Sequence, residues 1–272
     1  MSIAGKRIII TGARGAFGTA VTGELLALGA RVIGLDLTPS DPGADREVIE
    51  CDVRDQLSVD RAVGEAIGRL GGLDVLINNA GLGGPASGGM APDAAALAIL
   101  DVNAVGPWRV TSAAIDSLVE SRGRVVIIAS RMAFLGLPLA AAYGISKRAV
   151  HAYADSLRAE YGTHVKVTCV HPSFVRTPIH DSTSAAGLSV EGVSREEPLE
   201  AVVGAIVEAC GAARPKRDVA PTRGGAIQIF MARHFPRLTA AIVARTLRKR
   251  LRAGAFEDAP LATGLRDRVL GG

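Results

Sequence analysis

The sequence predicts an α/β fold, in which helices cover both faces of a doubly wound parallel sheet. Apolar runs that suit buried strands alternate with helix-length segments. These runs are mostly continuous stretches of Val, Ile and Leu, as in strands that are covered on both faces. The chain has 272 residues, of which 48% are hydrophobic, enough for one large α/β domain. The predicted strands are 7–11, 31–36, 47–51, 73–78, 124–130 and 165–171, with a seventh near 218–220.

A glycine-rich turn follows the first predicted strand. Gly12, Gly15 and Gly18 separate the strand at 7–11 from a helical segment at 19–29. Glycine at a strand-to-helix turn lets backbone N–H groups approach a pyrophosphate, and the helix N-terminus adds partial positive charge. The spacing G-x-x-x-G-x-G differs from the commoner G-x-G-x-x-G. The sequence therefore predicts a dinucleotide at this turn.

The second predicted strand ends in Asp36, 18 residues after Gly18. An acidic residue at this place can bind both ribose hydroxyls of NAD, and it repels the 2′-phosphate of NADP. Arg14, inside the glycine-rich turn, argues the other way because its guanidinium could reach a 2′-phosphate. A basic residue directly after Asp36 would favour NADP, but that position is occupied by Leu37. The prediction is NAD, with NADP as the alternative.

Polar residues also end the third and fourth predicted strands. Asp52 follows the strand at 47–51 and could meet the adenine amino group of a cofactor. Asn78 and Asn79 end the fourth strand, and Gly81 comes next but one, where the backbone must pass near the cofactor. The carboxyl ends of parallel strands meet at one edge of a sheet, which is where such folds bind ligands.

A serine, a tyrosine and a lysine form the candidate catalytic group. Tyr143 and Lys147 stand four apart in YGISK, which places both side chains on one face of a helix. An ammonium beside the phenol should lower the pKa of Tyr143 and make it a general acid/base. Ser130, at the end of an apolar run, can hydrogen-bond and polarise the substrate oxygen. Asn103 lies in a helical stretch, where a buried amide needs partners, and a water-bridged link to Lys147 would provide one.

In these motifs the chain resembles the short-chain dehydrogenase/reductase family over roughly residues 5–210. The resemblance implies a Rossmann-type sheet that binds NAD(P) and a Ser-Tyr-Lys group in which Asn103 closes a proton relay. One departure is Pro172-Ser173, where the family usually has Pro-Gly beside the nicotinamide. The matching segments are TGARGAFG at 11–18, Asp36, CDV at 51–53, NNAG at 78–81, Asn103, Ser130, YGISK at 143–147 and HPSFVRT at 171–177.

The resemblance also divides the chain and assigns its contacts. It implies an NAD(P)-binding catalytic domain at 1–213, with a substrate lid near 180–198, and the charge pattern beyond it predicts a basic, helical extension at 214–272. Substrate would contact Ser130, Met132 and Tyr143. The implied cofactor-binding residues are Gly12, Arg14, Gly15, Ala16, Phe17, Gly18, Asp36, Leu37, Asp52, Val53, Asn79, Ala80, Gly81, Tyr143, Lys147, Pro172, Val175 and Thr177.

The predicted reaction is the interconversion of a secondary alcohol and a ketone by hydride transfer. The segment 130–143 between the catalytic Ser and Tyr is almost wholly apolar, which suits a steroid, a terpenoid or a long-chain alcohol. The alternatives are an NADP-linked 3-oxoacyl-type reductase and a nucleotide-sensing binding protein without turnover. The complete Ser-Tyr-Lys-Asn set argues against the sensor, because binding alone needs no proton relay. The residues that could line the pocket, or else pack the loop or a subunit contact, are Met132, Phe134, Leu135, Leu137 and Leu139.

The last fifth of the chain is basic. Between 214 and 252 there are eleven Lys or Arg residues and one acidic residue, Asp218. The segment 237–252 predicts an amphipathic helix with Val243, Leu247 and Leu251 on its apolar face. Such a helix can lie on an anionic membrane, bind an acidic carrier or a nucleotide-bearing substrate, or pack on the domain. Nucleic-acid binding is not expected, since the chain has no recognition motif and few aromatic residues.

Location and assembly follow from the remaining composition. Three scattered cysteines without metal-like spacing predict a reduced, cytoplasmic protein with no metal site; they are Cys51, Cys169 and Cys210. The chain has no run of about 18 apolar residues that could span a membrane, and its start lacks the apolar stretch of a signal peptide. Small and apolar residues in the helices within 103–121 and 143–161, which the family commonly pairs, predict a homodimer or homotetramer.

Overall fold

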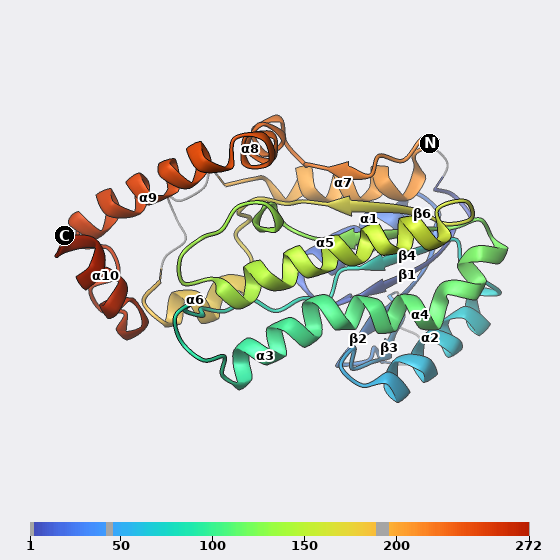
Figure 1. Ribbon diagram of the computed structural model, residues 1–272. Helices are drawn as coiled ribbons and strands as arrows, with labels where there is room; N and C mark the ends of the chain where they lie inside the picture. Colours follow the sequence, from blue (N-terminus) through green and yellow to red (C-terminus); the bar gives the residue numbers. More distant parts are fainter. Residues whose placement is uncertain (1–2, 42–45, 189–195, 272) are drawn as a thin grey trace.

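A computed structural model describes residues 3–41, 46–188 and 196–271, and in them seven parallel strands form one sheet (Figure 1). The predicted α/β fold is confirmed, including the seventh strand. The order across the sheet is β3-β2-β1-β4-β5-β6-β7, so the chain builds outward from β1 in one direction and then from β4 in the other. The strands are β1 (Arg7–Thr11), β2 (Arg31–Asp36), β3 (Val48–Glu50), β4 (Val75–Asn78), β5 (Arg124–Ile128), β6 (Lys166–Val170) and β7 (Asp218–Val219).

Helices cover both faces of the sheet. The helices α1 (Ala16–Ala27) and α7 (Leu199–Gly211) pack on one face, around Ile8, Ile10 and Ile206. On the other face lie α2 (Gln56–Leu70), α4 (Gly106–Glu120) and α5 (Ala141–Tyr161), around Ile9 and Leu76. Burial of both sheet faces explains why the strand sequences are apolar throughout rather than alternating.

Local signals set several helix ends. The Asp55 carboxylate accepts a 3.0 Å hydrogen bond from the Leu57 N–H at the start of α2, and Gly71 ends that helix with a left-handed φ of 74°. The Asp93 carboxylate accepts in the same way from Ala96 at the start of α3 (Ala94–Leu100). Between α3 and α4 the chain makes a π-helical turn, Asp101–Val105, and such turns are often found at functional sites.

The chain after β7 forms a helical extension beyond the carboxyl edge of the sheet (Figure 1). It contains α8 (Arg223–His234), α9 (Pro236–Arg252) and α10 (Thr263–Leu270). β7 lies after residue 213 and pairs with β6. The last strand of the sheet therefore belongs to the segment that we assign to the extension. The division of the chain into two parts at residue 213 stays a prediction. In the predicted lid, the turn Pro178–His180 leads into the short α6 (Asp181–Ala185), whereas 189–195 lie outside the described residues.

Candidate active site

Ser130 lies just beyond the carboxyl end of β5, in extended backbone. Its hydroxyl accepts a 3.1 Å hydrogen bond from the Met132 N–H and lies 3.5 Å from the Pro172 carbonyl oxygen. It also lies near the phenol of Tyr143, whose pKa it lowers by side-chain hydrogen bonding, against the larger rise that burial causes. The serine side chain is buried and held from several sides, so its hydroxyl is fixed in direction.

Tyr143 and Lys147 share one face of α5, as their spacing predicts. The Lys147 ammonium is buried, donates a 2.8 Å hydrogen bond to the Ile128 carbonyl, and lies 5.5 Å from the centroid of the Tyr143 ring. Burial lowers the pKa of Lys147 to about 8. The three side chains Ser130, Tyr143 and Lys147 are thus brought together from β5 and α5.

The expectation that Lys147 lowers the pKa of Tyr143 is wrong for this structure. Burial raises the pKa of the phenol to about 12, and the hydrogen bond with Ser130 opposes that rise only in part. The reason is the cost of desolvating a phenolate inside the protein. Tyr143 therefore holds its proton at neutral pH.

Asn103 lies in the π-helical turn rather than in a regular helix. Its amide pairs with the backbone of Leu82, accepting from the N–H at 2.7 Å and donating to the carbonyl at 2.9 Å. It also donates to the Ser146 hydroxyl at 3.1 Å. A methyl group built on Gly81 would lie 3.4 Å from the Asn103 oxygen and 3.8 Å from the Lys147 nitrogen. Asn103 and Lys147 therefore flank one backbone position, and the water-bridged link between them stays a prediction.

The glycine-rich turn packs against the end of β4. Gly12 has a left-handed φ of 65°, and a Cβ there would lie 2.8 Å from the Ala80 Cα. A Cβ on Gly18 would lie 2.1 Å from the Gly12 carbonyl oxygen. The Asn79 side chain donates to the carbonyls of Thr11 and Gly12 at 2.9 and 3.0 Å. The turn keeps the open backbone that a pyrophosphate needs, so these residues fit a dinucleotide.

Asp36 faces this turn from the end of β2. Its two carboxylate oxygens accept 2.8 Å hydrogen bonds from the backbone N–H groups of Arg14 and Leu37. The Arg14 guanidinium donates to the Pro39 carbonyl at 2.8 Å. The acidic and the basic candidate for ribose recognition therefore lie side by side.

The remaining cofactor candidates surround the same edge of the sheet. Both carboxylate oxygens of Asp52 accept from the Arg54 guanidinium, which lowers the pKa of Asp52. Val53, next in the chain, is buried in the core. Across the edge, Val175 is buried and Thr177 lies 3.5 Å from its carbonyl oxygen.

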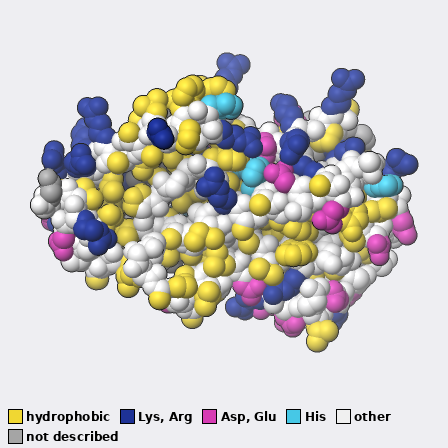
Figure 2. All heavy atoms as spheres, viewed as in Figure 1, with side chains coloured by type: hydrophobic (Ala, Val, Ile, Leu, Met, Phe, Trp, Pro, Cys, Tyr) yellow, Lys and Arg dark blue, Asp and Glu magenta, His cyan; other side chains and the backbone are white. Residues whose placement is uncertain are grey.

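A cavity of about 320 Å³ opens beside Tyr143, roofed by α8 and α9. Figure 2 shows hydrophobic side chains gathered at this end of the molecule, with Lys and Arg at its edge. Most of the loop residues proposed for the pocket do line it, but Phe134 does not, because its ring packs against His151 and His171. Lining residues from the loop include Arg131, Met132, Leu135, Leu137 and Leu139, and α9 adds Thr239, Ile242, Val243, Thr246, Leu247 and Arg250.

A family model for short chain dehydrogenases matches residues 6–187 of the chain. The chain belongs to this family. Momilactone A synthase from Oryza sativa subsp. japonica is 30% identical over 79% of this chain and 80% of its own length. L-fucose dehydrogenase from Bos taurus is 30% identical over 74% of this chain and 77% of its own length. A short-chain dehydrogenase from Burkholderia cenocepacia J2315, solved in complex with NADP, is 25% identical with a TM-score of 0.77 and covers 89% of this chain and 99% of its own.

As a short-chain dehydrogenase, the protein is an oxidoreductase that uses NAD(P). In the described part of the chain, no helix combines the length and the hydrophobicity needed to cross a membrane.

The sequence patterns missed several residues of this short-chain dehydrogenase site. Ser146 is fully buried and bridges Asn103 to the Tyr143 carbonyl, although its YGISK context offered a signal. Arg131, directly after Ser130, is also buried, and its guanidinium contacts Gln228 on α8. The α9 residues were recognised as an apolar face, but only the fold shows that this face covers the cavity.

Proposed function

We propose that this short-chain dehydrogenase interconverts a secondary alcohol and a ketone, with Tyr143 exchanging the proton. The observation that carries the proposal is that Ser130 and Lys147 lie beside Tyr143, which lines the wall of an apolar cavity. Serine, tyrosine and lysine are the residue types that can orient an oxygen, move its proton and tune that transfer.

Each side chain has a distinct role in this proposal. In the direction of reduction, Tyr143 donates its proton to the developing alkoxide, which is a much stronger base than the phenolate. Ser130 donates a hydrogen bond to the same oxygen and fixes the carbonyl in place. Lys147 places a positive charge near the phenol and stabilises the phenolate that forms. A bound nicotinamide supplies or accepts the hydride at the substrate carbon.

Asn103 acts as a positioning residue. Its paired hydrogen bonds to Leu82 hold the backbone next to Gly81, and Gly81 lies between Asn103 and Lys147. We infer that this arrangement keeps a path open for a proton between Lys147 and solvent. Loss of the amide should slow turnover more than it weakens binding of the cofactor.

We propose NAD as the preferred cofactor. Asp36 lies at the end of β2 with a carboxylate that would meet the ribose hydroxyls and repel a 2′-phosphate. Arg14 is the opposing group, and the Burkholderia relative was solved with NADP. The Arg14 guanidinium is already engaged by the Pro39 carbonyl, which supports the choice of NAD.

A hydrophobic alcohol or ketone, of steroid, terpenoid or long-chain type, suits the cavity best. Its wall is made largely of leucine, isoleucine, valine and methionine side chains, and Arg131 and Arg250 also line it. A 3-oxoacyl compound is the alternative, since its chain could lie along the same wall. A nucleotide sensor without turnover is disfavoured because it would need neither Ser130 nor Tyr143.

A substrate panel tests the proposed reaction. The purified protein is mixed with NAD or NADH and with hydrophobic secondary alcohols, their ketones, 3-oxoacyl thioesters and sugars, and NADH absorbance is followed. We expect turnover with at least one hydrophobic alcohol–ketone pair at a kcat/KM at least tenfold above that for any sugar. Turnover limited to sugars or to 3-oxoacyl thioesters would overturn the substrate proposal.

We also propose a peripheral contact with anionic membranes. The residues first expected to insert, Val243, Leu247 and Leu251, face the cavity or the protein interior, and Leu251 is only 2% exposed. The exposed apolar side chains that could insert instead are Phe230, Phe235 and Leu238, with Arg237 among them. Flotation with anionic and neutral vesicles at low and high salt tests this, because the electrostatic part is screened by salt.

A homodimer or homotetramer is proposed on the surface of α4 and α5. Trp108 on α4 is 61% exposed and Ile145 on α5 is 58% exposed, and the Trp108 ring stacks on Tyr153 at 5.6 Å. Exposed apolar side chains on two neighbouring helices suit a contact with a second copy of the chain.

A further inference from the structure

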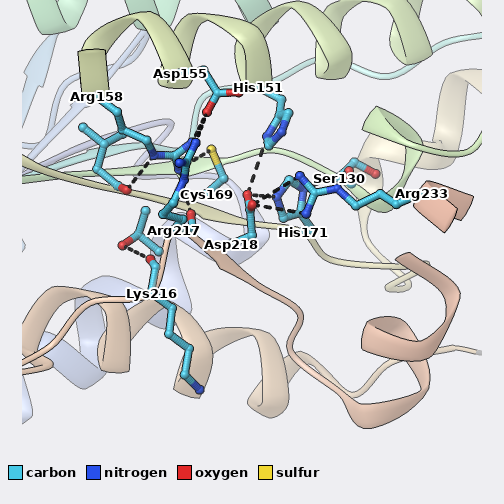
Figure 3. Close-up of polar contacts among 12 residues, drawn as sticks. Ser130, His151, Asp155, Arg158, Cys169, His171, Lys216, Arg217, Asp218 and Arg233 are labelled. Carbon is cyan, nitrogen blue, oxygen red and sulfur yellow. Dashed lines mark hydrogen bonds and ion pairs between the residues drawn. The ribbon is translucent and has the colours of Figure 1, made fainter. Parts of the chain in front are cut away.

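Four side chains that can bind a metal converge behind Ser130, outside the cavity. They come from three elements: His151 from α5, Cys169 from β6, His171 from the end of β6, and Asp218 from β7. One nitrogen of each histidine, the thiol sulfur and a carboxylate oxygen all lie within 4.8 Å of one another (Figure 3). Cys169 is the strand partner of Asp218 across the β6–β7 pair, so the register of the sheet places them together.

His171 makes two contacts that a neutral ring cannot both satisfy. Its Nδ1 lies 3.2 Å from the Ser130 carbonyl oxygen, which only accepts, so Nδ1 carries a proton. Its Nε2 lies 2.9 Å from an Asp218 oxygen. An ionised Asp218 carboxylate also only accepts hydrogen bonds. A metal ion that is bound by both Nε2 and an Asp218 oxygen would satisfy His171 as a neutral ring.

His151 favours the cation. Its Nδ1 is buried, makes no hydrogen bond, and lies 3.6 Å from the same Asp218 oxygen that His171 contacts. A neutral imidazole offers the lone pair of one ring nitrogen to a metal ion. A metal ion at the centre would give this nitrogen a partner.

The outer atoms of the ligands are already held in place. The Arg158 guanidinium lies 3.7 Å from the Cys169 sulfur, and that of Arg233 lies 3.4 Å from the second Asp218 oxygen. The Ser130 carbonyl holds Nδ1 of His171 in the same manner. Metal-binding histidines and carboxylates are commonly oriented by such outer hydrogen bonds. The two guanidinium groups add positive charge beside the cluster. The charge of a bound divalent ion would itself be balanced by one thiolate and one carboxylate.

We propose that His151, Cys169, His171 and Asp218 form a four-coordinate site for Zn²⁺. Two imidazoles, one thiolate and one carboxylate are a donor set that zinc accepts in tetrahedral geometry, and the mixture of nitrogen and sulfur disfavours Mg²⁺ and Ca²⁺. Binding replaces the thiol proton of Cys169 by the metal and releases it to solvent. A cysteine thiol is ordinarily protonated at neutral pH, so proton release accompanies binding.

The site is structural in this proposal. It ties α5 to the far edge of the sheet, and through His171 it holds the Ser130 carbonyl. The phenyl ring of Phe134 lies 5.0 Å from both imidazole rings and separates the cluster from the cavity lining. Zinc would therefore stabilise the fold beside the catalytic serine without touching substrate.

Titration with Co²⁺ and Zn²⁺ tests the site. Protein without a polyhistidine tag is treated with chelator, and Co²⁺ is added while visible and near-ultraviolet absorbance are recorded. We expect one equivalent of Co²⁺ to bind with the strong visible bands of a tetrahedral site and a thiolate charge-transfer band. Zn²⁺ should displace the Co²⁺, and at about 100 times its Kd it should raise Tm by roughly 5 °C. Absence of stoichiometric binding to the wild type would overturn the proposal.

Variants separate this site from adventitious binding. Cys169→Ser should abolish the charge-transfer band, and His151→Ala should weaken Co²⁺ binding at least tenfold. The matched controls are Cys210→Ser, an equally buried cysteine on α7, and His164→Ala, an exposed histidine, and both should bind as the wild type does. Circular dichroism checks that each variant is folded. A charge-transfer band that survives in folded Cys169→Ser, or is lost in folded Cys210→Ser, would contradict the assignment.

Discussion

The side-chain ammonium of Lys147 donates a 2.8 Å hydrogen bond to the main-chain carbonyl of Ile128. This bond joins α5 to the last residue of β5, two positions before Ser130. The two halves of the catalytic group, which lie on different elements, are thereby held in one arrangement before any ligand binds. The same contact buries the ammonium, and that burial lowers the pKa of Lys147 to about 8.

Removal of the Tyr143 hydroxyl should stop the reaction. In Tyr143→Phe we expect kcat to fall at least ~10²-fold, because proton transfer loses its donor. The Kd for NAD should change less than about threefold, since the ring stays in place. Tyr161→Phe, at the other end of α5, is the matched control and should keep full activity. Substantial turnover by Tyr143→Phe would sink the mechanism.

Lys147 should make the stability of the fold depend on pH in a defined window. Its pKa falls from 10.5 to about 8 on folding, so between these values the unfolded chain binds more protons and stability rises with pH. Relative to Lys147→Met, the wild type should gain on the order of 3 kcal/mol between pH 8 and 10.5. Urea unfolding of both proteins at several pH values measures this. A stability difference that does not vary with pH would show that the ammonium is not buried.

The choice of cofactor should depend on Asp36. We expect the wild type to bind NAD more tightly than NADP, and Asp36→Ser to lose at least tenfold of that preference, because the repulsion of the 2′-phosphate is removed. Asp60→Asn, which removes a charge from the outer side of α2, should leave the preference unchanged. Calorimetric titration with both nucleotides measures it. Tighter binding of NADP by the wild type would mean that Arg14 decides instead.

Filling the cavity from α9 should exclude large substrates. Val243 faces the cavity, whereas its neighbour Ala244 faces solvent. In Val243→Trp we expect KM for a bulky hydrophobic substrate to rise at least tenfold while the Kd for NAD is unchanged. Ala244→Trp adds the same ring on the outer side and should behave as the wild type does. Equal effects of the two variants on KM would place the substrate elsewhere.

Charges on the outer surface of α4 and α5 should break the assembly. Light scattering of the wild type at micromolar concentration should give the mass of a dimer or tetramer. Trp108→Glu combined with Ile145→Glu should give a monomer, because an unpaired carboxylate is costly to bury in an interface. Leu57→Glu, on the exposed side of α2, is the control. A monomeric wild type would rule out the proposed contact.

The strands and the Tyr143–Lys147 pair could be predicted because both depend on spacing along the chain. Continuous Val and Ile runs indicate strands buried on both faces, and a separation of four residues indicates one helix face. The glycine-rich turn could also be predicted from the sequence. The left-handed φ of Gly12 and the close approach of Ala80 both require glycine at position 12. In these cases the physical cause acts within a few residues, so the sequence by itself determined the fold class and the catalytic residue types.

Only the tertiary structure decided which side chains meet. Three features depend on burial between elements that are distant in sequence. They are the raised pKa of Tyr143, the turn of Phe134 away from the cavity, and the packing of α9 over that cavity. The cluster of His151, Cys169 and Asp218 is the clearest case, because its members have no motif spacing. They meet because β7 pairs with β6 in a register that sets Asp218 beside Cys169, and because α5 packs on the same sheet face. Spacing fixes the direction of a side chain within its own element, whereas the packing of apolar faces chooses its neighbours.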